Sequence, residues 1–289
     1  MFSKVLFASD LSEASTHVIE CIKDLKVYGT KEIILFHALG IKYLEDLRYS
    51  LVKEAEPVLQ KQKAMLERYG YSVTVHIAND GVSYELWKFA KQENVSMVVI
   101  GTHGRSLAFD VSLGGTAHKI IHDISKPLLV VRLRSDDKAM PVCQAACIDI
   151  DKPLLFTTDF SDTAELAFTY VEKMAESGIK HVVLMHVQDK TRIEKYLKDK
   201  LNEFNTIDTE RLEMLKDRLV KKGVKNVDCI LKYGIPVEEI INESRNRDYS
   251  LIIMGALGRS LVKDVFIGSV SWNVVRNASQ PVLLIPPLK

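Results

Sequence analysis

A glycine-punctuated segment is the part of the sequence best suited to chemistry. Residues 255–269 read GALGRSLVKDVFIGS. Two residues separate Gly255 from Gly258, nine more precede Gly268, and Ser269 follows at once. Glycines let backbone N–H groups approach an anion because no Cβ stands in the way. A helix beginning near Gly268 would add free N–H groups and the positive end of its dipole. The spacing therefore predicts phosphate binding.

Two familiar phosphate-binding patterns do not fit this loop. A Walker loop would carry Lys-Ser or Lys-Thr after its last glycine, and Gly268 is followed by Ser269. A dinucleotide fingerprint would follow the first strand of its domain, whereas this loop follows the fourth expected strand. A plain strand-to-helix connection, with glycines at tight turns, is the structural alternative.

The same segment occurs twice in the chain. Residues 95–127 align without gaps on residues 249–281, and eleven of these 33 positions are identical. The first copy has its loop glycines at Gly101, Gly104 and Gly114. A repeat of this regularity predicts two tandem copies of one domain.

The start of each copy repeats as well. FASDLS in the first copy matches FTTDFS in the second, so Asp10 and Asp159 are equivalent. Ser12 and Ser161 follow these aspartates by two residues and occupy the expected N-cap position of the next helix.

Short apolar runs, rich in β-branched residues, alternate with helical patterns in both copies. Such continuously apolar strands are typical of sheets buried on both faces. Five strands alternating with four helices predict a doubly wound α/β domain with a five-stranded parallel sheet, present in tandem. The expected strands are residues 5–8, 33–37, 73–77, 97–100 and 128–131, then 154–157, 182–187, 227–231, 251–254 and 282–285.

A polar segment joins the two copies. We expect a first domain over residues 1–133, a linker over residues 134–151 and a second domain over residues 152–289. Cys143 and Cys147 lie four apart in this linker, but a metal site would need more ligands than the sequence offers nearby.

Composition narrows the class of protein. The chain has 289 residues, of which 47% are hydrophobic and 27% charged, and its 39 basic and 38 acidic residues leave a net charge of +1. This near-neutral balance predicts no basic patch for binding nucleic acid or a membrane surface. No apolar run approaches the roughly 18–20 residues of a membrane span, and the first ten residues do not form a signal peptide. Four cysteines are too few for a secreted disulfide framework, so a cytoplasmic protein is expected.

The motif and its context resemble the ATP-binding branch of the universal stress protein family. That branch has a glycine, two residues, a glycine, nine residues, then a glycine and a serine or threonine. The resemblance covers nearly the whole chain twice, with an aspartate after each first strand and His37 or His186 ending each second strand. It implies ATP or AMP at the carboxyl ends of strands one and four, where doubly wound sheets bind ligands. Mg²⁺ with the phosphates is left open.

The resemblance also implies roles for single residues. Asp159 would contact the ribose or lie near the base, and Val187 would meet the adenine through its backbone. The loop residues would hold the phosphates and ribose. The candidates in the second copy are Thr158, Asp159, Phe160, Val187, Met254, Gly255, Gly258, Arg259, Gly268, Ser269, Val270 and Ser271. Those in the first copy are Ser9, Asp10, Leu11, Ala38, Ile100, Gly101, Gly104, Gly114, Gly115 and Thr116.

Several candidates carry a structural alternative. Asp10 and Asp159 could help to cap the following helices, which is compatible with ligand contact. His37 and His186 favour a satisfied structural histidine over metal or acid–base chemistry.

The charged residues of the loops have two interpretations. His103 could touch a phosphate or lie in solvent. Arg105 and Arg259 could bind phosphate, or could pair with Asp110 and Asp264 to shape the loop.

Three functions remain in view. The leading one is an adenine-nucleotide-binding module for stress response or signalling, acting through nucleotide-dependent conformation or partner binding. The others are a slow ATP hydrolase and a scaffold with vestigial sites. A phosphoryl-transfer enzyme would show a lysine on the phosphates and paired metal-binding acids. The sequence has neither constellation, which favours binding over catalysis.

The last strand of each copy predicts how the copies assemble. Residues 127–131 and 281–285 are apolar and lie at the expected sheet edges. The family resemblance implies that fifth strands pair antiparallel, and an open apolar edge favours such pairing. We expect an intrachain pseudo-dimer of the two copies, with a homodimer of whole chains as a further step.

The two sites are expected to differ in affinity. The first copy has Gly115 where the second has Ser269, so it lacks one hydroxyl donor. A lost hydrogen bond to a charged group costs about 1.5–3 kcal/mol, or about tenfold or more in affinity. Thr116 recovers part of this loss if the helix start shifts. The second site should therefore fill first.

Substitutions in the second copy test this asymmetry. Ser269→Ala should weaken nucleotide binding several-fold, and Gly268→Val should abolish it because a branched side chain takes the space of the phosphate. Calorimetry on the separated halves measures both affinities. Equal affinities of the two unmodified halves would refute the role given to Ser269.

Overall fold

The computed structural model divides the chain into two compact units, Met1–Ile148 and Asp149–Lys289. Each unit is described by itself. The structure describes residues 1–40, 45–102, 114–132, 134–135, 141–142, 149–196, 198–258 and 267–288.

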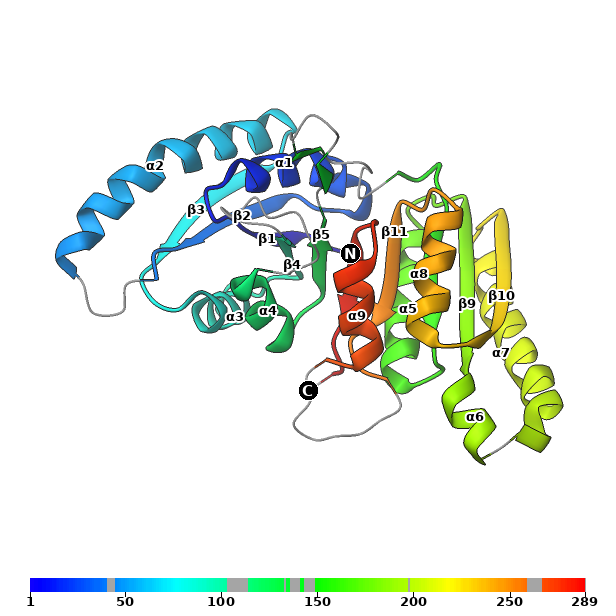
Figure 1. Cartoon of the computed structure of the whole chain (residues 1–289). Coiled ribbons are helices and arrows are strands. Elements are labelled where there is room, and N and C mark those ends of the chain that lie inside the picture. Colours follow the sequence, from blue (N-terminus) through cyan, green and yellow to red (C-terminus); the bar gives the residue numbers. More distant parts are fainter. Residues whose placement is uncertain are drawn as a thin grey trace. The chain divides into compact units, whose positions relative to one another are not determined.

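Unit 1 is a five-stranded parallel sheet in the order β3-β2-β1-β4-β5. Helix α1 packs with α2, and α3 with α4, on opposite faces of this sheet (Figure 1). A short antiparallel pair, β6 and β7, follows. The elements are β1 (Lys4–Ala8), α1 (Glu13–Ile22), a 3-10 turn (Leu25–Tyr28), β2 (Glu32–Ala38), α2 (Glu45–Arg68), β3 (Ser72–Ala78), α3 (Val82–Gln92), β4 (Met97–Gly101), α4 (Gly115–His122), β5 (Leu128–Val131), β6 (Arg134–Ser135) and β7 (Pro141–Val142).

Unit 2 repeats this arrangement in the order β10-β9-β8-β11-β12, again with parallel pairs. Helix α5 packs with α7, and α8 with α9. The elements are β8 (Leu154–Thr158), α5 (Asp162–Ala175), β9 (His181–Asp189), α6 (Lys190–Tyr196), a 3-10 turn (Lys198–Lys200), α7 (Leu201–Lys221), β10 (Asn226–Gly234), α8 (Pro236–Asn246), β11 (Leu251–Gly255), α9 (Ser269–Asn277) and β12 (Val282–Ile285).

These sheets confirm the predicted fold class of two tandem α/β domains with parallel sheets. In each unit the chain runs outward from the first strand to the third and then returns to the other side of the first for the fourth. Strands β1 and β8 are paired on both edges, β1 with β2 and β4, and β8 with β9 and β11. The carboxyl ends of the neighbouring first and fourth strands mark the switch point of a doubly wound sheet, where ligands bind.

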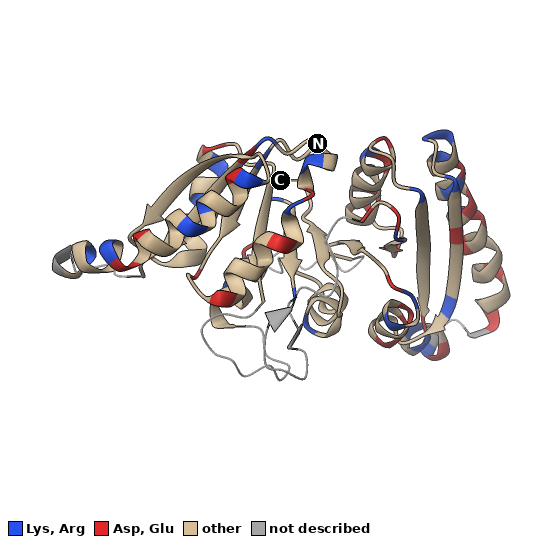
Figure 2. Ribbon diagram, turned by 90° about the horizontal axis from the view of Figure 1, so that it is seen from above, with Lys and Arg blue, Asp and Glu red and all other residues tan. Residues whose placement is uncertain are grey.

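The strands form because their side chains can be buried on both faces. Every residue of β5, β8, β11 and β12 is buried. Charged residues lie mostly on helices and connections, with few on the strands (Figure 2). This division of apolar and charged residues matches the expected strands.

Unit 2 has two features that the sequence did not predict. Strands β9 and β10 stay paired as far as Asp189 and Gly234, beyond the expected ends. Helix α6 then follows β9 directly. The β9–β10 ladder satisfies backbone groups beyond the end of the apolar run, so the paired strands extend past it.

The serines expected at helix starts are confirmed as N-caps. The Ser12 side chain accepts a hydrogen bond from the Ser15 backbone N–H, and the Ser161 side chain accepts one from Ala164. These bonds fix where α1 and α5 begin, immediately after the first strand of each unit.

The expected linker, residues 134–151, lies largely outside the described residues, and with it Cys143 and Cys147. Cys21 in α1 is disulfide-bonded, whereas Cys229 carries a free thiol. Burial raises the pKa of the Cys229 thiol to about 11, so the thiol is protonated and unreactive near neutral pH. Among the described helices, none is both long and apolar enough to cross a membrane.

A buried tyrosine anchors one end of unit 2. The Tyr249 hydroxyl donates a 2.6 Å hydrogen bond to Glu243 Oε1, and both side chains are buried. Burial raises the pKa of the Tyr249 phenol, and the bond to Glu243 raises it further. The phenol therefore stays protonated at all physiological pH values, and its hydroxyl remains the hydrogen-bond donor to the Glu243 carboxylate.

Tyr249→Phe should lower the free energy of unfolding by about 1–3 kcal/mol, because it leaves the buried Glu243 carboxylate without its hydroxyl donor. Urea unfolding followed by circular dichroism measures the change. Tyr84→Phe is the matched control, since Tyr84 is 68% exposed and should change stability little. Equal effects of the two substitutions would contradict a special role for Tyr249.

Candidate functional site

The turn after β1 is organised by one carboxylate oxygen. Asp10 Oδ1 accepts hydrogen bonds from the Ser12 backbone N–H at 3.0 Å, from the Ser12 hydroxyl and from the Ser15 hydroxyl. The Leu11 N–H donates to Ser9 Oγ at 3.1 Å. Local side chains thereby satisfy a turn at the strand end, where the switch point lies.

Unit 2 has the same turn. Asp159 Oδ1 accepts from the Ser161 N–H at 3.1 Å and from the Ser161 hydroxyl at 2.6 Å. The Phe160 N–H donates to Thr158 Oγ1 at 2.9 Å. In both units, then, the aspartate shapes the turn while the serine caps the helix, so the structural alternative for Asp10 and Asp159 is realised at Oδ1.

The residue after each aspartate has a left-handed backbone. Leu11 has φ of 65° and Phe160 has φ of 58°. This region is uncommon for bulky residues and costs of order 1–3 kcal/mol. It is held in place by the hydrogen bonds to Asp10 and Asp159. Strain of this kind concentrates at functional sites, and its occurrence in both units marks the two turns as equivalent.

A histidine secures each first strand at its carboxyl end. His37 Nδ1 lies 2.8 Å from the Ser9 carbonyl oxygen, and His186 Nδ1 lies 2.7 Å from that of Thr158. These bonds support the interpretation of both residues as structural. His186 also lies beside a carboxylate, because its Nε2 is 3.5 Å from Asp208 Oδ2.

The loop glycines of unit 2 have different reasons to be glycine. A Cβ on Gly255 would lie 3.1 Å from Thr163 Cγ2 and 3.2 Å from the Ala164 nitrogen, too close for the packing against α5. A Cβ on Gly258 would lie 2.8 Å from Asp159 Oδ2. The loop and the aspartate therefore face each other, as the sequence predicts.

Gly268 is different. A Cβ there would meet the protein at 3.5 Å or more, which is ordinary contact. Its N–H donates to the Ala256 carbonyl at 2.7 Å, which closes the loop onto the end of β11. A Cβ fits there without a clash, so packing among the described residues does not by itself require glycine at this position.

Two helices, α4 and α9, begin at glycine residues of the site. Gly114 and Gly268 are the N-cap residues of α4 and α9, and neither provides a side-chain cap. The first N–H groups of a helix have no intrahelical partner, so these ends suit an anion. Ser269 is exposed at the start of α9, whereas the Ser271 hydroxyl donates to the Gly255 carbonyl at 2.8 Å. Ser271 thus ties helix to strand.

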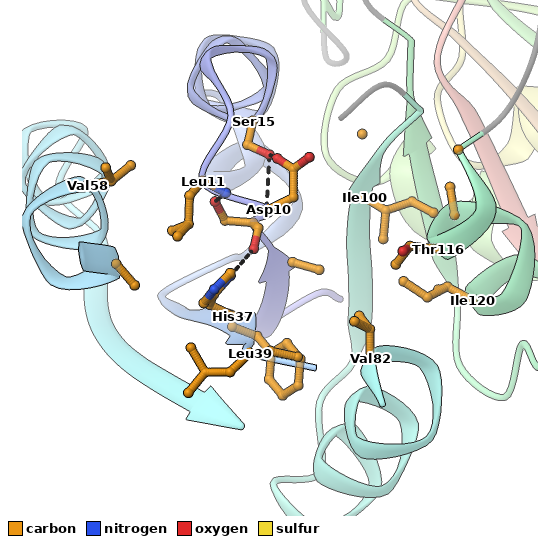
Figure 3. Close-up of a pocket in the computed structure, with 18 of the residues that line it drawn as sticks. Asp10, Leu11, Ser15, His37, Leu39, Val58, Val82, Ile100, Thr116 and Ile120 are labelled. Atoms are coloured by element: carbon orange, nitrogen blue, oxygen red, sulfur yellow. Dashed lines mark hydrogen bonds between the residues drawn. The ribbon is translucent and has the colours of Figure 1, made fainter. Parts of the chain in front are cut away.

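Unit 1 encloses a cavity of about 720 Å³ at its switch point (Figure 3). Every described candidate of the first copy lines it. Asp10 and Leu11 come from the β1 turn, His37 from β2, Ile100 from β4 and Thr116 from α4. Segments distant in sequence therefore converge on one site. The other candidates on the lining are Ser9, Ala38, Gly101, Gly114 and Gly115.

The cavity has an apolar wall that the sequence did not single out. Leu39 follows β2, Ala55 and Val58 lie on α2, Val82 begins α3 and Ile120 belongs to α4. The helical periodicity predicts that such residues face inward, but it does not separate a core position from a cavity lining. The wall suits a flat apolar group such as a base.

Some predicted residues lie outside the described part of the chain. These are Gly104 and Arg259 of the candidate set, and His103, Arg105, Asp110 and Asp264 of the loops. Among the described residues, no group of three or more His, Cys, Asp or Glu side chains could hold a metal ion.

Comparison with known proteins shows the family to which the chain belongs. The profile of the universal stress protein family matches residues 1–132 and again residues 152–286. The chain belongs to the universal stress protein family. The two matches coincide with the two α/β units, so this is a tandem member.

Individual relatives agree with this assignment. A universal stress protein of Methanocaldococcus jannaschii is 33% identical over 153 residues, covering 46% of this chain and 94% of its own. One from Mycolicibacterium smegmatis is 26% identical over 247 residues, covering 84% of this chain and 78% of its own. The crystal structure of a universal stress protein from Archaeoglobus fulgidus covers 99% of this chain and 98% of its own, with a TM-score of 0.76 and 24% identity. That last likeness shows the shared fold.

Two glycine substitutions should separate packing from ligand space in this tandem stress protein. Gly255→Ala should lower the free energy of unfolding by about 1–3 kcal/mol because its Cβ overpacks against α5. Gly268→Ala should change it by less than about 0.5 kcal/mol. Urea titration of both variants measures the difference. A Gly268→Ala variant as unstable as Gly255→Ala would show that Gly268 is a packing residue.

Proposed function

We propose that this universal stress protein binds adenine nucleotides, ATP or AMP, at the switch point of each unit and acts as a stress-response or signalling module. The observation that carries the proposal is the unit 1 cavity, which combines an apolar wall with the start of α4. A nucleotide has the same two halves, an apolar base and an anionic phosphate chain.

Each part of unit 1 matches one part of the ligand. Leu39 and Val58 offer apolar surface for the base. Gly115 and Thr116 offer backbone N–H groups and a hydroxyl for phosphate at the N-terminus of α4, which begins after Gly114. Asp10 Oδ1 is engaged within the turn, and the same carboxylate lines the cavity, where a ribose hydroxyl would find an acceptor.

Unit 2 offers a second site of the same design. Asp159 faces Gly258 across the loop, and α9 begins uncapped at Gly268. Val187 belongs to β9, one residue after His186, and its backbone would meet the base. Mg²⁺, where it accompanies the phosphates, would neutralise charge on them. We assign it no protein ligand.

The turn after the first strand offers a way to transmit binding. Asp10 connects the cavity to the start of α1 through Ser12 and Ser15. A ligand that contacts Asp10 acts on the residues that fix the N-terminus of that helix. We propose that nucleotide occupancy changes the surface of the helix and its connections, and that this surface is read by a partner.

We further propose a cytoplasmic location and a pseudo-dimer in which the fifth strands β5 and β12 pair within the chain. Both strands are apolar, and each lies at one edge of the sheet of its own unit, where an open apolar edge favours pairing. The segment 134–151 would then act as the linker between domain 1, residues 1–133, and domain 2, residues 152–289.

Nucleotide release and thermal stability test the binding function. Freshly purified protein, denatured and examined by mass spectrometry, should release ATP, ADP or AMP. Added nucleotide at 100 times its Kd should stabilise the fold by about 2.7 kcal/mol through mass action and raise the Tm. No shift with millimolar ATP, ADP or AMP would contradict the proposal.

A pair of variants on α2 supplies the control. Val58→Trp fills part of the unit 1 cavity and should reduce the affinity of that site. Tyr49→Trp places the same side chain on the same helix at a position that is 79% exposed, and should leave affinity unchanged. Multiple-turnover assays with ATP distinguish simple binding from slow hydrolysis.

A further inference from the structure

The last strand of the unit 2 sheet, β10 (Asn226–Gly234), has one open edge (Figure 1). It pairs with β9 along all nine of its residues. In the part of the chain that the structure describes, no strand pairs with its other edge. Such an edge presents a row of unpaired backbone N–H and C=O groups, which is a template for a further strand.

Three features that protect edge strands from pairing are missing in β10. Natural edge strands are often very short, contain proline or are twisted away by a bulge. β10 has nine residues, no proline and an uninterrupted register with β9. Val227, Ile230 and Leu231 give the strand apolar character, and each of them is only partly buried. The strand can therefore accept a partner along its whole length.

The two charged residues of β10, Asp228 and Lys232, have opposite signs and lie two residues to either side of Ile230. Lys232 is exposed and forms no ion pair within the described residues. Asp228 Oδ2 lies 2.6 Å from Arg247 Nη1 and 3.1 Å from His181 Nε2, on a side chain that is 45% exposed. The bond from Arg247 lowers the pKa of Asp228. The carboxylate is thus charged at neutral pH, and both of these bonds leave its Oδ1 for another partner.

Two β10 strands match each other when they run antiparallel about Ile230. Each Asp228 then lies opposite Lys232 of the second copy, so the charge pair occurs twice. Cross-strand pairs of opposite charge are favourable, as are pairs of an aromatic with a β-branched side chain. The other opposed pairs are Val227 with Tyr233 and Cys229 with Leu231.

Other registers of the same two strands are less favourable. A pair centred on Asp228 or on Lys232 puts like charges opposite each other, which is destabilising. A pair centred on Cys229 or Leu231 leaves both charged residues opposite uncharged ones. The pairing about Ile230 is therefore the register that the charges favour.

Unit 1 does not have this pattern on its own outer strand. β3 (Ser72–Ala78) occupies the same place in its sheet, and its seven residues include no Asp, Glu, Lys or Arg. The registers with β2 and β9 make Thr74 the counterpart of Asp228 and Ala78 that of Lys232. The matched charges belong to unit 2 alone, so pairing through them closes as a twofold dimer and does not extend into a filament.

We propose that β10 is an interface between two copies of this chain, which pair antiparallel about Ile230 in a closed twofold dimer. Backbone hydrogen bonds between the two strands supply the contact, as in other cases of strand addition to a sheet edge. The two Asp228–Lys232 pairs set the register. This interface is separate from the proposed pairing of β5 with β12 within one chain, and it does not depend on nucleotide binding.

Sedimentation velocity of the full chain over a range of micromolar concentrations measures this assembly. The unmodified chain should form dimers as its concentration rises. Lys232→Glu places an acid opposite Asp228 twice in each dimer and should raise the dimer dissociation constant about tenfold or more. Lys225→Glu is the matched control. It makes the same charge change at an exposed position just before the strand and should leave the dissociation constant unchanged.

Complementary variants assign the contact to its two residues. Asp228→Lys puts a lysine opposite Lys232 and should also weaken the dimer. Mixing this variant with Lys232→Glu should restore dimers, because each charge then meets the opposite one in the other chain. Asp228→Lys also loses the bond to Arg247, so circular dichroism checks its fold. If it is unfolded, the comparison of Lys232→Glu with Lys225→Glu decides alone.

The inference is overturned by any of three results. A chain that stays monomeric at every concentration has no such interface. Dimers that are equally stable with Lys232→Glu and with Lys225→Glu form through another surface. Two folded variants that fail to form dimers on mixing contradict the pairing of Asp228 with Lys232.

Discussion

Both units depend on one interaction, the carboxylate of Asp10 or Asp159 accepting hydrogen bonds from the serine two residues later. It turns the chain sharply after the first strand and lets the same serine cap the next helix. The fourth strand then returns on the other side of the first, which opens the switch point beside that turn. Without this turn the cavity in unit 1 would lose its floor and α1 its starting point.

The site combines features that suit a ligand with an anionic part and an apolar part. The N-cap residues of α4 and α9 are glycines, which provide no side-chain cap, so the first N–H groups of these helices suit an anion. Packing among the described residues does not by itself require glycine at Gly268. Unit 1 adds an apolar wall. Family membership, the repeated fold and these features together support a nucleotide at each switch point. This support for nucleotide binding does not require a catalytic group among the described residues.

Much of this could be predicted from sequence because the relevant signals are local. The buried strands, the capping serines and the glycine spacing each appear within a few residues. The pairing of His186 with Asp208 could not be predicted, since the two lie far apart in sequence and meet only through the packing of α7 on β9. Leu39 and Val58 were missed because an apolar helix face looks the same over a core and over a cavity. Helix α6 lacked a distinguishing apolar pattern.

The left-handed turn residues have a consequence for the unfolded chain. Glycine would adopt the φ values of Leu11 and Phe160 without strain, yet it would also give the unfolded chain more conformations to lose. A leucine or phenylalanine narrows that ensemble, and the carboxylate bonds hold the strained form once it is folded. The turn is therefore rigid before any ligand arrives. Less conformational entropy remains to be lost on binding, which favours affinity at both sites.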